Sequence, residues 1–249
     1  MSDLELAGRV AVITGGTRGI GRAIAESFLR EGAHLFLTYA GDEDAAQETR
    51  RRLGLAEDAV AKVDVRDRDQ LRTLFSSIEA KHGRIDVLVN NAGINKPSDF
   101  DKITDVDWDE ILSVNLKGPF IVTQEALHLL RKSDAGSIIQ IGSVSGQYGG
   151  PRTAHYAASK AGLISLSQVV ARFLAGENIR SNTIAAGLIE SEMATGALSN
   201  PSVQAAAQNV LLRRFGRPAE VAEVAVFLAS NRSSYITGQT INANGGLYF

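Results

Sequence analysis

The sequence predicts an α/β fold, a doubly wound three-layer sandwich with a seven-stranded parallel sheet and helices on both faces. Short runs rich in β-branched residues alternate with longer amphipathic segments along the whole chain. Runs such as Val10–Ile13 and Ile138–Ile141 are almost continuously apolar, as expected for strands of a parallel sheet that is covered on both faces. Alternating strands and helices joined by right-handed crossovers build this architecture.

The order of these segments sets the expected elements. The strands are expected at Arg9–Thr14, Leu35–Thr38, Ala59–Val63, Asp86–Asn90, Ser137–Gly142, Arg180–Ile184 and Gln239–Asn242. The helices are expected at Gly19–Glu31, Glu43–Leu53, Asp67–His82, Trp108–Arg131, Thr153–Ala175 and Pro218–Ser230. No low-complexity linker divides the sequence, so residues 1–249 are expected to form a single domain. A stretch at about 188–214, rich in Ala, Ser, Asn and Gln, is expected to form a small lid.

The composition argues against several classes of protein. A formal charge of -2 and a pI near 6.1 offer no attraction to nucleic acid. The sequence contains no cysteine, which rules out disulfides and thiolate ligands and suits a cytoplasmic protein. The acidic first residues and the lack of a long apolar run predict an uncleaved, soluble protein that does not enter a membrane. The histidines show no metal-ligand spacing, so no metal is expected.

A glycine-rich turn follows the first strand and opens directly into a helix. Such a turn presents backbone N–H groups and the positive end of the helix dipole to a pyrophosphate. The alternative is a tight strand-to-helix turn that binds no ligand. The candidate cofactor-binding residues in this turn are Gly15, Thr17, Arg18, Gly19, Ile20 and Gly21.

Three side chains point to chemistry at a carbonyl group. Tyr156 and Lys160 are four residues apart and share one helix face, while Ser143 lies at the carboxyl edge of a parallel strand. When hydride adds to a carbonyl carbon, the oxygen gains charge and an acid must supply a proton. Tyr156 can be that acid if the charge of Lys160 lowers its pKa, and Ser143 can donate to the same oxygen. Alone, the Tyr-x-x-x-Lys spacing also arises by chance on a helix surface.

Taken together, these motifs resemble the short-chain dehydrogenase/reductase family, whose fold is of the Rossmann type. The glycine spacing, Asn90–Gly93 after the fourth strand, and the Ser, Tyr and Lys positions carry the resemblance, which runs nearly end to end. It implies an NAD(P)-dependent enzyme that interconverts an alcohol and a carbonyl. The implied catalytic residues are Asn115, Ser143, Tyr156 and Lys160. In the family, the residue matching Asn115 holds a water that links the lysine to a proton path, and a helix kink there is compatible with this role.

The resemblance also implies further cofactor contacts. Asn91, Ala92 and Gly93 match residues that brace the sheet and line the adenosine, and Asp64 and Val65 match residues that hold the adenine ring. Tyr156 and Lys160 contact the cofactor as well, and the nicotinamide end falls to Gly187, Ile189 and Ser191. Ala186 stands where the family usually has proline, and we expect a looser turn and a more mobile lid from this change.

The second strand indicates which nicotinamide cofactor is used. It ends at Tyr39 without the carboxylate that would bind a ribose 2′-hydroxyl and repel a 2′-phosphate. Arg18 can meet a phosphate with its forked guanidinium, so NADP(H) is the expected cofactor. NAD(H) is the alternative, since Asp42 and Asp44 follow the strand closely and Arg18 could be a solvated loop charge.

Within the family the chain is most similar to the 3-oxoacyl-acyl carrier protein reductases of fatty acid biosynthesis, in Ile141–Ser143, Ala157–Gly162 and Asn244–Phe249. This implies reversible reduction of a 3-oxoacyl thioester on acyl carrier protein or coenzyme A. One alternative is another small ketone or alcohol of the sugar, polyketide or steroid type, because specificity depends on the lid. A scaffold or cofactor sensor without turnover is a third possibility, against which the intact tetrad argues. The basic residues that match carrier-docking positions are Arg131, Lys132 and Arg172, with Phe173 in place of the family's usual Glu.

The remaining expectations concern assembly and neighbouring side chains. The long helices Trp108–Arg131 and Thr153–Ala175 match family helices that pair across subunits, so we expect a homotetramer. Close approach is permitted by the small residues Ala157, Ala158, Ala161 and Gly162. Beside the catalytic residues, Ser145 is expected in a loop, Ser159 at the cofactor edge or against a packing partner, and His155 at the substrate mouth.

Overall fold

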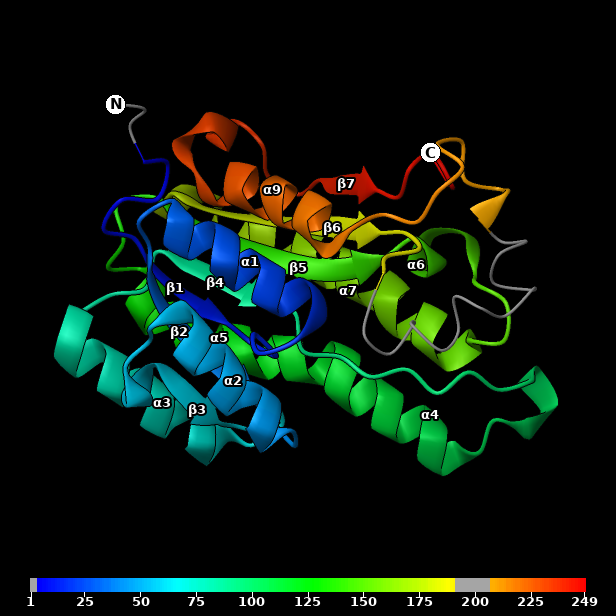
Figure 1. Ribbon diagram of the computed structural model, residues 1–249, viewed down its shortest axis with the longest axis horizontal. Helices are drawn as coiled ribbons and strands as arrows, with labels where there is room; N and C mark the ends of the chain where they lie inside the picture. The colour runs from blue at the N-terminus through cyan, green and yellow to red at the C-terminus, as the bar shows by residue number, and fades with distance from the viewer. Residues whose placement is uncertain (1–3, 191–206) are drawn as a thin grey trace.

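The computed structural model describes residues 4–190 and 207–249. Within these residues, seven parallel strands form one sheet in the order β3-β2-β1-β4-β5-β6-β7, which confirms the predicted sheet (Figure 1). The strands are β1 (Val10–Ile13), β2 (His34–Tyr39), β3 (Val60–Lys62), β4 (Val87–Asn90), β5 (Gly136–Ser143), β6 (Ile179–Ala186) and β7 (Thr240–Ala243).

Helices cover both faces of the sheet, as the apolar strands require. One face carries α1 (Gly19–Arg30), α2 (Glu43–Leu53) and α9 (Pro218–Ala229), and the other carries α3 (Arg68–His82), α5 (Gly118–Leu130) and α7 (Ala154–Leu174) (Figure 1). Polar side chains begin three of the helices, because Asp42, Asp67 and Thr104 each accept a backbone N–H of the first turn of α2, α3 and α4 (Asp105–Leu112).

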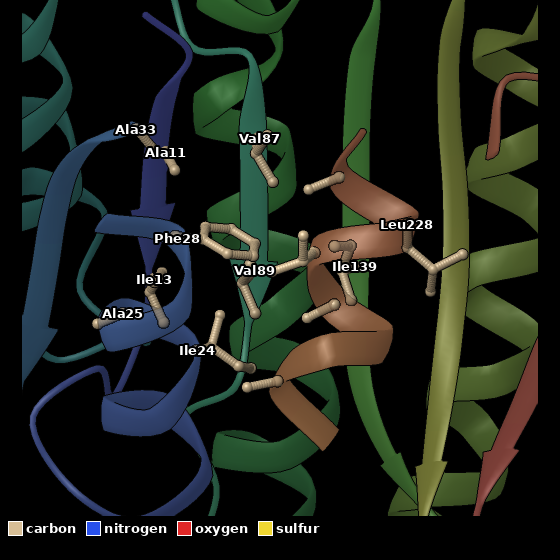
Figure 2. Close-up of a cluster of buried hydrophobic side chains, with 14 of the residues drawn as sticks. Ala11, Ile13, Ile24, Ala25, Phe28, Ala33, Val87, Val89, Ile139 and Leu228 are labelled. Atoms are coloured by element: carbon tan, nitrogen blue, oxygen red, sulfur yellow. The ribbon is translucent and has the colours of Figure 1, made fainter. Parts of the chain in front are cut away.

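The core on the α1 side joins the two halves of the sheet. Figure 2 shows Phe28 and Ile24 of α1 facing Val89 of β4, with Ile139 of β5 beside α9. All four side chains are fully buried. Because α1 and α9 both pack on the central strands, they fix the carboxyl ends of β1, β4 and β5 relative to one another.

The prediction of one continuous helix over Trp108–Arg131 is wrong. The chain instead forms α4, a π-helical turn over Ser113–Lys117, and then α5. Pro119 lies at the start of α5 and has no N–H, so the carbonyl of Asn115, four residues earlier, cannot accept its usual α-helical hydrogen bond. The interruption falls at Asn115, the predicted kink, and π-helical turns are often found at functional sites.

Smaller differences concern where elements end. β3 ends at Lys62, two residues before Asp64, whereas β5 extends to Ser143 and β6 to Ala186. A short helix, α6 (Ser145–Tyr148), stands where a loop was expected. Ser145 therefore begins a helical turn.

The order of the strands creates a crevice at the carboxyl edge of the sheet. β1 lies between β2 and β4, so the chain runs outwards in opposite directions from this point. In open parallel sheets, ligands bind outside the carboxyl ends of the strands at this switch point. The glycine-rich turn after β1 and Asn91–Gly93 after β4 both lie there.

Two further properties apply to the described residues, 4–190 and 207–249. None of their helices is both long and apolar enough to cross a membrane. Nor do their His, Asp and Glu side chains form a group of three or more that could hold a metal ion.

Candidate active site

The glycine-rich turn is locked to the end of β4 by Asn91. The Asn91 amide donates to the carbonyl oxygens of Thr14, at 3.0 Å, and Gly15, at 2.8 Å. Gly15 has a φ of +61°, which favours glycine. A Cβ on Gly21 would overlap the Gly15 carbonyl oxygen and the Asn91 amide nitrogen, so only glycine allows α1 to begin this close to the turn.

The Thr14 hydroxyl makes three hydrogen bonds in the crevice. No prediction from the sequence covered this residue. Its hydroxyl donates to the Val89 carbonyl at 3.3 Å and accepts the backbone N–H groups of Asn91, at 3.0 Å, and Ala92, at 3.1 Å. The side chain is buried. The available signal was a hydroxyl residue placed between an apolar strand and the first glycine. Thr14 and Asn91 therefore make the ends of β1 and β4 one unit.

The first turn of α1 is suited to an anion. The side chain of its N-cap residue, Arg18, accepts no hydrogen bond from the backbone N–H groups of this turn. The turn also contains no acidic residue. The N–H groups at the start of a helix have no intrahelical partner and carry partial positive charge. With the glycine cradle beside them, they fit the pyrophosphate of a dinucleotide.

Arg18 lies at the rim of this cradle and forms an ion pair. Its guanidinium is 2.9 Å from a carboxylate oxygen of Asp42, and both side chains are substantially exposed. Asp42 also accepts the Ala45 N–H at 3.0 Å and so caps α2. Tyr39 is partly buried at the end of β2, the strand next to β1 in the sheet. Thr17 is held by its carbonyl oxygen, which accepts the buried Thr49 hydroxyl at 2.7 Å.

Asp64 and Val65 follow β3 on the expected side of the sheet. The Asp64 carboxylate accepts hydrogen bonds from Nε and Nη2 of the Arg66 guanidinium, and this partner lowers the pKa of Asp64. Val65 is buried and packs against Gly118 at the start of α5, where a Cβ would lie 2.7 Å from the valine methyl. The β3 edge of the crevice is thus tied to the helix that follows Asn115.

Ser143, Tyr156 and Lys160 meet at the end of β5. The Ser143 side chain lies close enough to the Tyr156 phenol to act on its pKa. Lys160 lies one turn further along α7, and its Nζ donates to the Ile141 carbonyl at 2.8 Å and stands 5.6 Å from the centre of the Tyr156 ring. The spacing that the sequence predicted for these three residues therefore brings them together.

Burial changes the acidity of the pair. It raises the pKa of Tyr156, while the neighbouring Ser143 side chain acts in the opposite direction. Desolvation lowers the pKa of Lys160 to about 8. The sequence predicts a lowered tyrosine pKa, whereas in the protein alone the loss of water around the phenol outweighs the effect of Ser143.

Asn115 connects this pair to the loop after β4. Its fully buried side chain accepts the Ile94 N–H at 2.8 Å and donates to the Ile94 carbonyl at 2.9 Å. Its amide also reaches the Ser159 hydroxyl at 3.2 Å. A Cβ on Gly93 would lie 3.2 Å from the Asn115 oxygen and 3.5 Å from Lys160 Nζ, so these residues share one corner of the crevice.

The turn after β6 forms the opposite wall. Ala186 accepts the Val144 N–H at 2.9 Å, and the Gly187 N–H donates to the Ala243 carbonyl at 3.0 Å. Ile189 pairs with Gly216, which brings together the two described ends of the predicted lid. Ser191 lies outside the described residues.

Two neighbouring side chains are now placed. Ser159 contacts a packing partner, since its hydroxyl donates to the Tyr156 carbonyl at 2.7 Å and accepts from Asn115. The expectation that His155 lines the substrate mouth is wrong, because its side chain is fully buried and neither ring nitrogen has a protein partner.

Comparison with known proteins identifies the family. Residues 15–248 match a family model described as enoyl-(acyl carrier protein) reductase, from the short-chain alcohol dehydrogenase group. The chain belongs to the short-chain dehydrogenase/reductase family, and it is an NAD(P)-dependent oxidoreductase acting on hydroxyl and carbonyl groups.

Named relatives align over almost the whole chain. A 3-oxoacyl-[acyl-carrier-protein] reductase of Thermotoga maritima is 43% identical, with 98% of this chain and 99% of the relative covered. Proteins of the same name from Aquifex aeolicus, with 99% and 100% covered, and Staphylococcus aureus, with 96% and 97% covered, are 39% and 38% identical. A Brucella melitensis crystal structure titled short-chain dehydrogenase/reductase SDR: glucose/ribitol dehydrogenase has 34% identity, a TM-score of 0.92 and 99% coverage of both chains.

Proposed function

We propose that the protein reduces the ketone of a 3-oxoacyl thioester, carried on acyl carrier protein or coenzyme A, to the alcohol with NADPH. The observation that carries the proposal is the meeting of Ser143, Tyr156 and Lys160 at the carboxyl edge of the sheet, where Lys160 Nζ lies 5.6 Å from the centre of the Tyr156 ring and is held by the Ile141 carbonyl. The names of the full-length relatives support the thioester as substrate.

The residues of the crevice divide the reaction between them. A nicotinamide cofactor, when bound, would supply the hydride that the ketone carbon accepts. Tyr156 donates the phenolic proton to the ketone oxygen, and Ser143 donates a hydrogen bond to the same oxygen as its charge grows. The ammonium of Lys160 stabilises the tyrosinate that remains. Asn115, whose backbone carbonyl lacks an α-helical donor, holds a water through which Lys160 is reprotonated.

The cofactor would lie across the switch point of the sheet. The glycine turn and the uncapped start of α1 hold its pyrophosphate, Asp64 and Val65 its adenine, and Ala92 and Gly93 its adenosine side. Gly187 and Ile189 would face the nicotinamide end, and the family resemblance assigns Ser191, outside the described residues, to the same end. Arg18, at the rim of the glycine turn, favours NADP(H) over NAD(H). So does the end of β2, where Tyr39 stands in place of a carboxylate.

The cofactor preference can be tested at Arg18. We expect Arg18→Ala to raise the KM for NADPH by roughly 10- to 100-fold, the value of one or two charge-assisted hydrogen bonds, and to leave the KM for NADH almost unchanged. Asp42→Asn is the matched variant, because asparagine can still cap α2 but no longer competes for the guanidinium. We expect it to lower the KM for NADPH, and steady-state kinetics with both cofactors measure the effect. Equal losses with the two cofactors after Arg18→Ala would contradict the assignment.

Acyl carrier protein is proposed as a partner through the basic residues just after α5 and on α7. Arg131 pairs with Glu177 and Lys132 with Glu79 at the surface. Exposed pairs of this kind contribute little free energy, so an acidic carrier can replace the intramolecular partners. Arg172 stands beside Phe173, whose side chain is 65% exposed and could pack against the carrier.

A homotetramer is proposed from the surface of the long helices. An apolar groove between the π-helical turn and α7 is lined by Leu116, Phe120 and Leu166, and the nearby Val169 is exposed. Burying such a surface in a second subunit would be favourable. Size-exclusion chromatography with light scattering should give four times the chain mass of 26.5 kDa, and a monomer would overturn the assignment.

A panel of substrates tests the proposed reaction. We expect acetoacetyl-coenzyme A to oxidise NADPH rapidly, and acetoacetyl-acyl carrier protein to do so at least as well. Crotonyl thioesters test the enoyl reduction that the family description names, and sugar and steroid ketones test the alternative substrates. Turnover only with those ketones would favour the alternative, and no turnover with any ketone would overturn the proposed reaction.

A further inference from the structure

The segment after β7 forms a compact turn, Asn244–Tyr248, which we call the β7 turn. The Asn244 side chain holds it, since the amide donates to the Tyr248 carbonyl at 2.8 Å and the amide oxygen accepts the Gly246 N–H at 2.9 Å. Asn244 is buried, whereas Phe249, the residue after the turn, is 92% exposed. The turn is therefore held from within at its first residue, and its outer side chains are free to contact other parts of the chain.

The β7 turn packs against the nicotinamide wall of the crevice. Gly187 donates to the carbonyl of Ala243, the residue before the turn. A Cβ on Gly187 would lie 2.6 Å from Asn244 Cα, so the two backbones touch. Any movement of Asn244 would therefore displace the loop that leaves β6.

The same turn also contacts the chain that returns from the predicted lid. The Leu212 N–H donates to the Gly245 carbonyl at 3.1 Å. A Cβ on Gly245 would lie 2.7 Å from a methyl group of Val210. Residues 210–212 thus rest directly on the β7 turn.

A third contact leads to Ser143 through α6. The Tyr248 ring stacks on Tyr148, with ring centres 5.8 Å apart and an interplanar angle of 27°. Tyr148 is the last residue of α6, and at the first residue the Ser145 N–H donates to the Ser143 hydroxyl at 3.1 Å. α6 also lies on α7, since a Cβ on Gly146 would be 2.6 Å from the Lys160 carbonyl carbon. Figure 1 shows the end of the chain close to α6 and to the returning segment.

We propose that Tyr248 is a positioning residue for the reaction. Through its stack on Tyr148 it holds α6, and α6 orients the Ser143 hydroxyl toward the substrate oxygen and Tyr156. The β7 turn thereby keeps Ser143, the Gly187 wall and the base of the lid in one arrangement. This inference rests on the proposed function, because Ser143 must act on a substrate oxygen.

Tyr248→Leu tests this role, with Tyr248→Phe as the variant that keeps the stack. If the whole energy of the aromatic pair serves to position Ser143, its loss corresponds to about a three- to tenfold change in rate. We therefore expect Tyr248→Leu to lower kcat by that factor. The Kd for NADPH should stay within twofold, and Tyr248→Phe should restore kcat. Tyr235→Leu is the matched control, because Tyr235 is fully exposed, and it should leave kcat unchanged.

A double-mutant cycle separates positioning from a general loss of structure. If Tyr248 acts through Ser143, Tyr248→Leu should cost less than twofold in a Ser143→Ala background, measured as residual NADPH oxidation with the best ketone of the substrate panel. The same loss in both backgrounds, or no loss in either, would overturn the inference and leave the proposed function standing. Inactivity of the unmodified protein towards every ketone would instead overturn the proposed function, and this inference with it.

Discussion

Replacing Tyr156 by phenylalanine is expected to lower kcat for ketone reduction by roughly 10²- to 10⁴-fold, the usual contribution of a positioned general acid. The substitution removes only the hydroxyl and leaves the ring 5.6 Å from Lys160 Nζ. NADPH should therefore bind with a Kd within about threefold of the wild type, since the rest of the crevice is unchanged. Stopped-flow NADPH oxidation and fluorescence titration measure the two quantities.

The matched variant is Ser143→Ala, which removes the partner hydroxyl and keeps the proton donor. A single lost hydrogen-bond donor to a developing oxyanion costs about 10²- to 10³-fold in kcat. If Tyr156→Phe retained the rate of the unmodified protein, Tyr156 would not be the acid. If Tyr156→Phe abolished NADPH binding as well, its effect could not be assigned to proton transfer.

Lys160→Met is expected to abolish reduction and at the same time to stabilise the fold near neutral pH. Burial lowers the pKa of Lys160 from 10.5 to about 8, so below pH 8 the folded protein holds a charge that water would solvate better. This difference corresponds to at most roughly 3 kcal/mol of unfolding free energy at pH 7. The lost hydrogen bond to the Ile141 carbonyl, worth about 1 kcal/mol, offsets part of the gain.

The pH dependence has a definite sign. Between about pH 8 and 10.5 the unfolded chain binds more protons at Lys160 than the folded chain, so the free energy of unfolding of the unmodified protein rises with pH relative to Lys160→Met. The advantage of the variant should be full below pH 8 and gone above about 10.5. Thermal or urea unfolding at pH 7 and pH 10.5 measures it, and a variant that is less stable at both pH values would contradict the prediction.

The kcat for reduction should also depend on the protonation of Lys160, but with the opposite pH dependence. The ammonium that stabilises the tyrosinate is lost as the pH rises through about 8, so kcat for reduction should fall above that pH. Stability and rate therefore move apart at Lys160. This opposition is expected where a charge is kept buried for function rather than for packing.

Much of the crevice could be predicted from local patterns. The strands followed from continuous apolar runs, and Ser143, Tyr156 and Lys160 from a strand end and a helical spacing, because these periods are imposed by backbone geometry. The family resemblance implied that Asn91 helps to brace the sheet, and the structure adds that it does so by two amide hydrogen bonds to the glycine turn.

Other features depend on contacts between distant segments. The π-helical turn at Asn115 was missed as an element, although Pro119, four residues later, was a readable signal. The burial of His155 and the formation of α6 follow from packing on neighbouring elements, and four residues are too few for a periodic pattern. The Arg18–Asp42 pair joins two loops that are 24 residues apart, and charge alone does not reveal such a partner.

The hydrogen bonds that join Thr14 and Gly15 to Asn91 and Ala92 have a consequence for how the sequence can evolve. They use the hydroxyl of one strand end and the amide of another, and none of them involves Arg18 or Asp42 at the rim. Substitutions at the rim can therefore alter which dinucleotide is accepted while the support beneath it stays intact. Cofactor choice should be an easily altered trait in this protein, separable by engineering from both folding and catalysis.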